Sequence, residues 1–145
     1  MLHQMDPEKL RMYPDPEIKM LTECLASRYQ VRPEQVFVGN GSDEVLALAF
    51  LAFFAPEDRI AFPKISYSFY PVYADLFAVP YDAVALREDF SLDAGVFAGD
   101  YKGIVFANPN APTGMAMPLD QVEQILREHT AALVVVDEAY VDFGG

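Results

Sequence analysis

Cysteine, tryptophan, positive charge and long apolar runs are all scarce in this chain of 145 residues. The one cysteine, Cys24, cannot form an internal disulfide, which is typical of proteins that fold in a reducing cytosol. Lys and Arg number 10 against 22 Asp and Glu, a net charge of −12 that argues against nucleic acid or anionic membranes as partners. The longest apolar run, residues 45–55, covers 11 residues, well short of the roughly 18 needed to span a bilayer. It predicts instead a helix that is buried on nearly all sides.

The beginning of the sequence shows no basic segment followed by an apolar one, so no secretory signal is expected. No internal repeat, low-complexity tract or interdomain linker is visible. The composition, 52% hydrophobic and 22% charged, is that of a globular protein. We therefore expect a cytoplasmic globular domain.

Residues 133–136 are four consecutive aliphatic residues, and the acidic pair Asp137 and Glu138 follows them. This pattern predicts a central parallel strand that is covered on both faces. Ligands of open α/β sheets bind just outside the carboxyl ends of the strands, so Asp137 is a candidate site residue. An acidic pair at a strand end is equally typical of an ordinary turn. A nucleotidase of the P-loop class is excluded, because none of the four lysines follows a glycine-rich loop of the required spacing.

Strand-like apolar segments alternate with segments of helical periodicity along the whole chain. The expected strands are 35–38, 59–62, 79–86, 102–107 and 133–136, and the expected helices are 16–29, 42–55, 65–77 and 118–129. A short helix or irregular segment is expected at 90–98. This alternation predicts an α/β fold with three layers, in which helices cover both faces of a mainly parallel sheet.

Polar clusters stand where several of these strands end. Residues 39–44, Gly-Asn-Gly-Ser-Asp-Glu, join a strand to a helix N-terminus, which is a common site for anions. The same residues also fit an ordinary acidic first turn, and carboxylates would repel a phosphate unless only the backbone donates to it. Residues 108–114 and 137–140 form two further clusters, and Tyr67 follows another strand. We expect all of them at one edge of the sheet.

Five motifs, taken together, resemble a known family. They are Tyr-Pro-Asp-Pro at 13–16, Gly-Asn-Gly-Ser-Asp-Glu at 39–44, residues 63–70, Asn-Pro-Asn-Ala-Pro-Thr-Gly at 108–114 and Val-Asp-Glu-Ala-Tyr at 136–140. Their order and spacing are similar to those of the fold-type I aminotransferases, which use pyridoxal 5′-phosphate (PLP), and most of all to the histidinol-phosphate aminotransferase group. The resemblance covers essentially the whole chain. It implies that the chain is part of the PLP-binding large domain of such an enzyme.

The resemblance also implies roles for individual residues. Asp137 would pair with the pyridine nitrogen of PLP and keep the ring protonated, so that the ring can accept electrons from the substrate. Tyr67 would stack on the ring, and the backbone N–H groups of Ser42 and Asp43 would hold the phosphate. Two further contacts are implied, from Tyr140 to the phenolic oxygen of the ring and from Tyr13 to the cofactor phosphate of a neighbouring subunit.

The sequence departs from the family pattern at several places. Ala111 stands where many relatives have an asparagine that contacts the ring oxygen, so either Asn110 replaces it or the contact is missing. Met12 stands where some relatives have arginine. The Schiff-base lysine of the family belongs to a segment beyond Gly145, and none of the four lysines occupies its place. We therefore expect the N-terminal arm, the Schiff-base lysine segment and the C-terminal small domain to be absent.

The function that follows from the resemblance is PLP-dependent transamination between histidinol phosphate and 2-oxoglutarate, carried out by an intact homodimeric enzyme without a metal ion. This chain alone is expected to be inactive. The alternatives are an aminotransferase for aromatic or other small substrates, a related PLP-dependent decarboxylase, and a non-catalytic fragment.

Overall fold

The computed structural model describes residues 6, 8 and 11–143, and the chain divides into two units, residues 1–40 and 41–145. The first unit contains helix α1 (Lys19–Tyr29) and a short 3₁₀ turn (Pro33–Gln35). Helix α1 begins later than the expected residue 16, because the Asp15 carboxylate makes a separate turn before it. This carboxylate accepts hydrogen bonds from the backbone N–H groups of Glu17 and Lys19 at 3.0 and 3.1 Å. The residue between them, Ile18, has a left-handed backbone with φ of 47°.

The expected strand at 35–38 is wrong. Gln35 ends the 3₁₀ turn, Val36 after it is extended, and residues 36–38 belong to no strand. A strand needs a neighbour whose backbone groups it can pair with, and none pairs with this segment in the part of the chain that the structure describes. The apolar pattern of residues 35–38 could not show that a partner strand is missing among the described residues.

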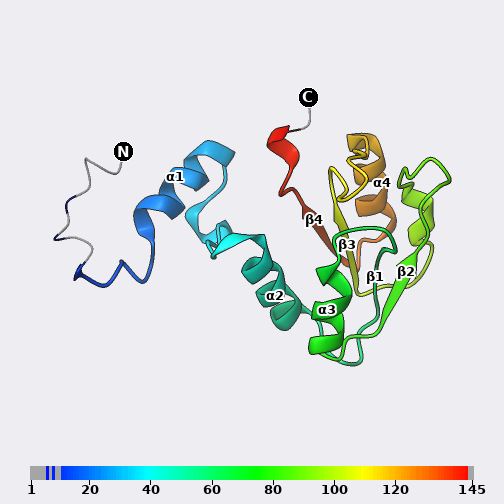
Figure 1. Cartoon of the computed structure of the whole chain (residues 1–145), viewed down its shortest axis with the longest axis horizontal. Coiled ribbons are helices and arrows are strands. Elements are labelled where there is room, and N and C mark those ends of the chain that lie inside the picture. The colour runs from blue at the N-terminus through cyan, green and yellow to red at the C-terminus, as the bar shows by residue number, and fades with distance from the viewer. Residues whose placement is uncertain (1–5, 7, 9–10, 144–145) are drawn as a thin grey trace. The chain divides into compact units, whose positions relative to one another are not determined.

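The second unit is built on four parallel strands (Figure 1): β1 (Ile60–Pro63), β2 (Tyr81–Val84), β3 (Gly103–Ala107) and β4 (Leu133–Asp137). Their order in the sheet is β2-β1-β3-β4. Every residue of β1 and β3 is buried, as the continuous apolar runs predict for strands covered on both faces. Strand β2 is shorter than the expected 79–86.

The prediction that 133–136 forms a central strand is wrong for the described residues. Strand β4 pairs only with β3 and lies at the edge of the sheet, and all of its residues are half-buried. An apolar run predicts that both faces of a strand are covered. It does not predict whether one or two neighbouring strands pair with its edges.

Helices cover both faces of the sheet, which confirms the three-layer α/β fold. Helices α2 (Gly41–Phe53) and α3 (Phe69–Leu76) pack on one face, where Phe50, Tyr70 and Tyr73 meet Ile60, Phe62 and Val105. Helix α4 (Leu119–Glu128) and a 3₁₀ turn (Ala94–Phe97) pack on the other, where Phe97 and Ile125 meet Ala61, Ile104 and Phe106. Successive residues of β1 and β3 thus alternate between the two cores, as strand geometry requires.

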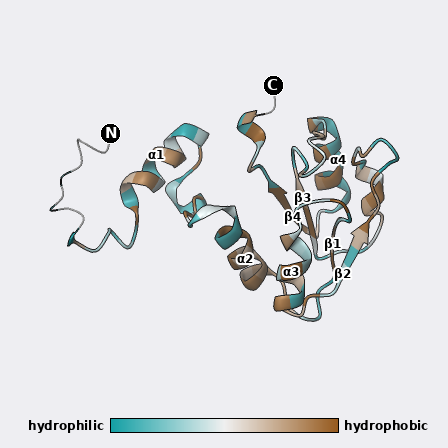
Figure 2. Ribbon diagram, in the orientation of Figure 1, coloured by the Kyte–Doolittle hydropathy of each residue, from teal (hydrophilic) through white to brown (hydrophobic). Residues whose placement is uncertain are grey.

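Helix α2 is apolar over most of its length (Figure 2) but is not buried on nearly all sides. Leu46 and Phe50 face the core, whereas Leu48, Leu51 and Phe53 are 40, 60 and 59% exposed. The expectation of a nearly enclosed helix is therefore wrong, since only the face toward the sheet is covered by the described residues. No helix among these residues is long and apolar enough to cross a membrane.

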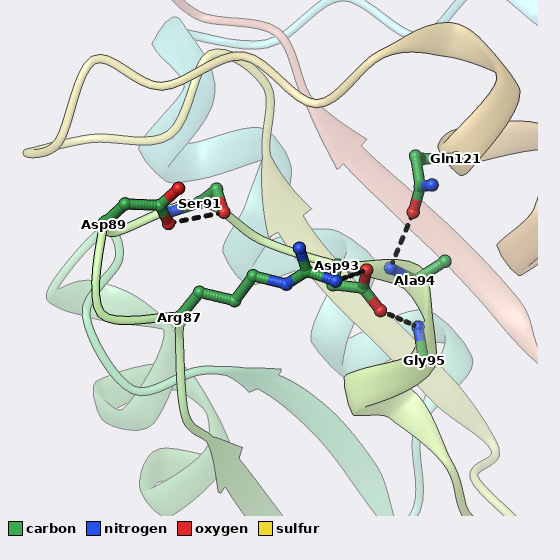
Figure 3. Close-up of polar contacts among 7 residues, drawn as sticks. All are labelled: Arg87, Asp89, Ser91, Asp93, Ala94, Gly95 and Gln121. Carbon is green, nitrogen blue, oxygen red and sulfur yellow. Dashed lines mark hydrogen bonds and ion pairs between the residues drawn. The ribbon is translucent and has the colours of Figure 1, made fainter.

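The loop from β2 to the Ala94–Phe97 turn is held by short-range polar contacts (Figure 3). Arg87 forms an ion pair with Asp93, and Asp93 also accepts a hydrogen bond from Gly95 N at 2.8 Å. The Gln121 side chain on α4 accepts a hydrogen bond from Ala94 N at 3.1 Å. The loop is therefore fixed to α4, on the face of the sheet opposite α2 and α3.

Gly103 offers a direct test of the packing between β3 and the segment that follows α2. A Cβ atom at this position would lie 2.4 Å from Cε1 and 2.5 Å from Cζ of the Phe54 ring. We therefore expect Gly103→Ala to lower the free energy of unfolding by about 1–3 kcal/mol, the usual cost of overpacking a core. Chemical denaturation measures this change.

Phe54→Leu supplies the control, because the smaller side chain makes room for the new methyl group. The double variant should then be less destabilised than the sum of the two single changes. If Gly103→Ala unfolded at the same denaturant concentration as the parent, the close approach of Phe54 would be disproved.

Candidate functional site

Asp137 is the last residue of β4, at the carboxyl edge of the parallel sheet. The register of the sheet places it beside Ala107, and Asn108 N donates to the Asp137 carbonyl at 2.9 Å. Its side chain is half-buried and is held at both oxygens. Oδ1 accepts a hydrogen bond from Ala139 N at 3.1 Å, and Oδ2 accepts one from the Tyr70 hydroxyl at 3.0 Å. Asp137 is thus fixed at the place where open α/β sheets bind their ligands.

Tyr70 lies on α3 and is completely buried. The pKa of Tyr70 is raised well above its usual value. The larger cause is burial, and the second is the adjacent negative charge of Asp137. The hydroxyl therefore stays protonated over the ordinary pH range and remains a hydrogen-bond donor to Asp137.

Asp43, in the first turn of α2, accepts hydrogen bonds from two tyrosines. The Tyr67 hydroxyl forms a short hydrogen bond with Oδ1, and the Tyr73 hydroxyl lies 3.4 Å from the same atom. The bond to Asp43, followed by desolvation, raises the pKa of Tyr67 from 10.0 to about 12. The carboxylate of Asp43 is thus occupied by tyrosines, which leaves the backbone of the helix end to meet any anion.

The N-terminus of α2 has the geometry of an anion site. Gly41 has φ of +84°, a conformation that other residues rarely adopt, while the space around it is open. The first N–H groups of a helix have no hydrogen-bond acceptor within the helix, and the helix dipole is positive at this end. Ser42 and Asp43 are exposed there. Binding of a phosphate by their N–H groups stays a prediction.

Tyr67 connects the two carboxylates. Its ring meets the Tyr70 ring edge to face at a centroid distance of 5.7 Å, and its hydroxyl reaches Asp43. Phe69 stacks on it at 5.7 Å with an interplanar angle of 18°. A half-buried aromatic ring therefore stands between the end of β4 and the start of α2.

Asn110 is buried, and both N–H groups of its side-chain amide are engaged. Nδ2 donates to the Ile65 carbonyl at 2.9 Å and to Thr113 Oγ1 at 3.1 Å, and Oδ1 accepts from the Ser66 hydroxyl at 2.7 Å. Donation from Nδ2 to a ligand would require the bond to Ile65 or the bond to Thr113 to break. The predicted donation from Asn110 to a cofactor would therefore cost an existing hydrogen bond. In the structure these bonds hold the 108–114 loop against the segment just before α3.

Tyr140 borders a pocket of about 450 Å³ at the same edge. The pocket is lined by Pro109, Asn110, Ala111, Pro112, Gly114, Tyr140 and Phe143. Tyr140 is half exposed, and its ring lies 6.5 Å from that of Phe143. Tyr140 therefore lines a space that a small molecule can enter.

Tyr13 belongs to the first unit and is completely exposed. The second unit by itself thus brings together Asp43, Tyr67 and Asp137 and places Asn110 and Tyr140 on the adjoining loops. Among the described residues, no group of three or more His, Cys, Asp or Glu side chains could hold a metal ion.

Three residues of this network were missed by sequence reasoning, Ser66, Tyr70 and Tyr73. Tyr70 is three residues after Tyr67, a helical spacing that could have signalled a shared face. No sequence pattern indicates its bond to Asp137, because the two residues are 67 positions apart.

Comparison with known proteins identifies similar chains. A family model described as aminotransferase class I and II matches residues 3–145. A histidinol-phosphate aminotransferase from Clostridium botulinum (strain Okra / Type B1) is 52% identical over 138 residues. The match covers 95% of this chain and 39% of the relative, so the chain spans well under half of that relative's length.

Two solved structures have a similar fold. Histidinol-phosphate aminotransferase from Sinorhizobium meliloti, solved in complex with pyridoxal-5′-phosphate, superposes with a TM-score of 0.77 at 24% identity. The superposition covers 90% of this chain and 37% of that one. L-threonine-O-3-phosphate decarboxylase from Porphyromonas gingivalis gives a TM-score of 0.80 at 25% identity, covering 92% of this chain and 41% of that one.

The Tyr67–Asp43 bond generates a pH prediction. Because the folded pKa of Tyr67 is raised, the bond stabilises the fold fully below pH 10.0 and its contribution is lost as the pH rises through about 12. We expect Asp43→Ala to return the pKa of Tyr67 toward its ordinary value. Residue-specific NMR titration of ¹³C-labelled tyrosine measures it, with Tyr67→Phe assigning the signal.

Asp120→Ala is the matched control, since Asp120 is an exposed residue of α4 on the other face of the sheet. It should leave the titration of Tyr67 unchanged. An unaltered titration in Asp43→Ala would show that the bond does not form in solution.

Proposed function

Because this chain belongs to the class I and II aminotransferase family, we propose that it forms part of a PLP-dependent enzyme that transfers the amino group of histidinol phosphate to 2-oxoglutarate. The identity of 52% with a histidinol-phosphate aminotransferase over 95% of the chain supports this substrate pair. The activity is proposed for the whole protein, because this chain spans 39% of that relative.

The observation that carries the proposal is the continuous series of contacts from the start of α2 to the end of β4. Asp43 contacts Tyr67, Tyr67 packs against Tyr70, and Tyr70 donates to Asp137. A helix N-terminus for a phosphate, an aromatic face and a fixed carboxylate thus lie at one edge of the sheet. These three features are complementary to the phosphate, the flat ring and the protonated ring nitrogen of PLP.

The residues fit PLP in chemistry as well as in position. PLP supplies an electron-accepting pyridinium ring that stabilises negative charge at the substrate Cα. Asp137 keeps lone pairs that its two existing hydrogen bonds do not use, and a carboxylate there holds the proton on the ring nitrogen. The N–H groups of Ser42 and Asp43 would hold the phosphate, and Tyr67 would stack on the ring.

At the phenolic oxygen of the ring, Tyr140 is the better candidate donor in this chain. It borders the pocket beside Ala111, whereas both N–H groups of the Asn110 amide are already used. We therefore assign Asn110 a supporting role in the loop rather than a contact with the ring.

The proposed enzyme is a cytoplasmic homodimer. Exposed apolar side chains of α2, including Leu48 and Leu51, offer surface for a second subunit, and large exposed patches favour association. The fully exposed Tyr13 is available to reach the cofactor phosphate of that subunit. The single exposed cysteine, Cys24, is compatible with a reducing compartment.

The cofactor assignment predicts weak, non-covalent PLP binding by this chain, because no lysine occupies the family position. Asp137→Ala should weaken binding about tenfold or more, since a charged hydrogen bond to the ring nitrogen contributes roughly 1.5–3 kcal/mol. Equilibrium dialysis with PLP measures the affinity.

Asp120→Ala should bind PLP like the parent. Borohydride treatment followed by intact-mass analysis should leave no stoichiometric adduct at one specific lysine. Such an adduct, or equal PLP affinity in Asp137→Ala, would contradict the assigned roles.

The substrate assignment predicts activity when the coding sequence downstream of Gly145 is included and supplies the lysine. Asp137→Ala should then lower kcat by about 10²-fold or more, on the order of 3 kcal/mol of transition-state stabilisation. Tyr140→Phe should lower kcat less than Asp137→Ala does, because the pyridine ring stays protonated. Single-turnover absorbance measurements with histidinol phosphate report the rate of proton transfer from the substrate Cα.

Transamination of an aromatic amino acid in place of histidinol phosphate would overturn only the substrate. Release of CO₂ would favour the decarboxylase alternative. A parent that bound PLP yet showed the same kcat after Asp137→Ala would refute the role of Asp137.

A further inference from the structure

Tyr70 is a buried hydroxyl that the family resemblance leaves without a role. Its side chain has no exposed surface, and its ring lies 6.0 Å from Phe62 and 5.7 Å from Tyr67. Burying a hydroxyl without a partner is costly, so its placement among aromatic rings requires a hydrogen-bond acceptor. Asp137 Oδ2, at 3.0 Å, is that acceptor.

The Tyr70 bond fixes a degree of freedom that the backbone cannot fix. Ala139 N, two residues along the chain, holds Oδ1 of Asp137 at 3.1 Å. One bond to one oxygen still lets the carboxylate rotate about that contact. A second donor at Oδ2, from a different element of the fold, sets the plane of the group, because the directions of both oxygens are then determined.

The segment that precedes Tyr70 is tied to the 108–114 loop. The Ser66 hydroxyl donates to Asn110 Oδ1 at 2.7 Å. Asn110 Nδ2 donates to the Ile65 carbonyl at 2.9 Å, just before α3 begins. The chain that leads into α3 is therefore fixed to the loop that follows β3, which restricts the position of the helix that carries Tyr70.

We propose that Tyr70 is a positioning residue that fixes the plane of the Asp137 carboxylate, so that the remaining lone pairs of Asp137 point out of the sheet edge toward a ring nitrogen. The inference rests on the proposed function for the identity of the ligand. The fixing of Asp137 by Tyr70 does not depend on any ligand, so the two can be tested separately.

The matched variants are Tyr70→Phe and Tyr101→Phe. Each removes one hydroxyl from a buried tyrosine that donates to an aspartate, since Tyr101 donates to Asp82 Oδ2 at 2.9 Å away from the proposed site. Both keep the aromatic ring, and their folding is compared by thermal unfolding. Any difference between them then reports the partner of the hydroxyl rather than the loss of a tyrosine.

The ligand-free readout is the plane of the Asp137 carboxylate, given by its χ2 angle in ligand-free crystal structures of the parent and of both variants. We expect the same χ2 angle in the parent and in Tyr101→Phe and a rotated carboxylate in Tyr70→Phe. The second readout is PLP affinity by equilibrium dialysis, which Tyr70→Phe should lower about tenfold while Tyr101→Phe leaves it unchanged.

Each outcome decides between the claims. An unchanged χ2 angle of Asp137 in Tyr70→Phe overturns the positioning role. A rotated carboxylate with unchanged PLP affinity overturns its relevance to the ring nitrogen. A rotated carboxylate in Tyr70→Phe together with a parent that does not bind PLP supports the positioning role and counts against the proposed function.

Discussion

The pairing of β3 between β1 and β4 is the constraint on which the described site depends. Strand β3 is buried along its whole length, so a shift of its register would move apolar side chains from one core to the other. The register sets Ala107 opposite Asp137, and Asn108 N continues the ladder to the Asp137 carbonyl. Asp137 therefore stands at the carboxyl edge, beside the end of β3, because of this register.

Tyrosine hydroxyls, rather than cationic side chains, hold the two carboxylates of the site in the described structure. Tyr67 and Tyr73 approach Asp43, and Tyr70 approaches Asp137. Such a neutral donor fixes the direction of a carboxylate without cancelling its charge, which is what partnership with a protonated ring nitrogen requires. No buried side-chain polar atom of the described residues lacks a partner, so the network is complete within itself.

The ion pairs of the described residues play a different role. Arg59 with Asp82 and Arg87 with Asp93 lie on the side of β2 and the loop after it, where their arginines are well exposed. Exposed pairs of this kind contribute little to stability. The strongly acidic composition is thus mostly a property of the surface, and the fold rests on the two apolar cores that flank β1 and β3.

The sequence by itself determined the layered α/β fold, the order of the elements from residue 41 onward and the clustering of polar residues at strand ends. These features follow from local periodicity and from turn residues, which each segment carries independently of the others. The five motifs also pointed to the aminotransferase family, to which the chain belongs. Residue identity alone was sufficient for these conclusions.

Only the tertiary structure decided which side chains meet. It left 35–38 unpaired, placed β4 at an edge, exposed one face of α2 and engaged the amide of Asn110. It also joined Tyr70 to Asp137 across 67 residues of sequence. Each of these outcomes depends on which neighbouring segment is present and in what register, and a local sequence pattern contains neither fact.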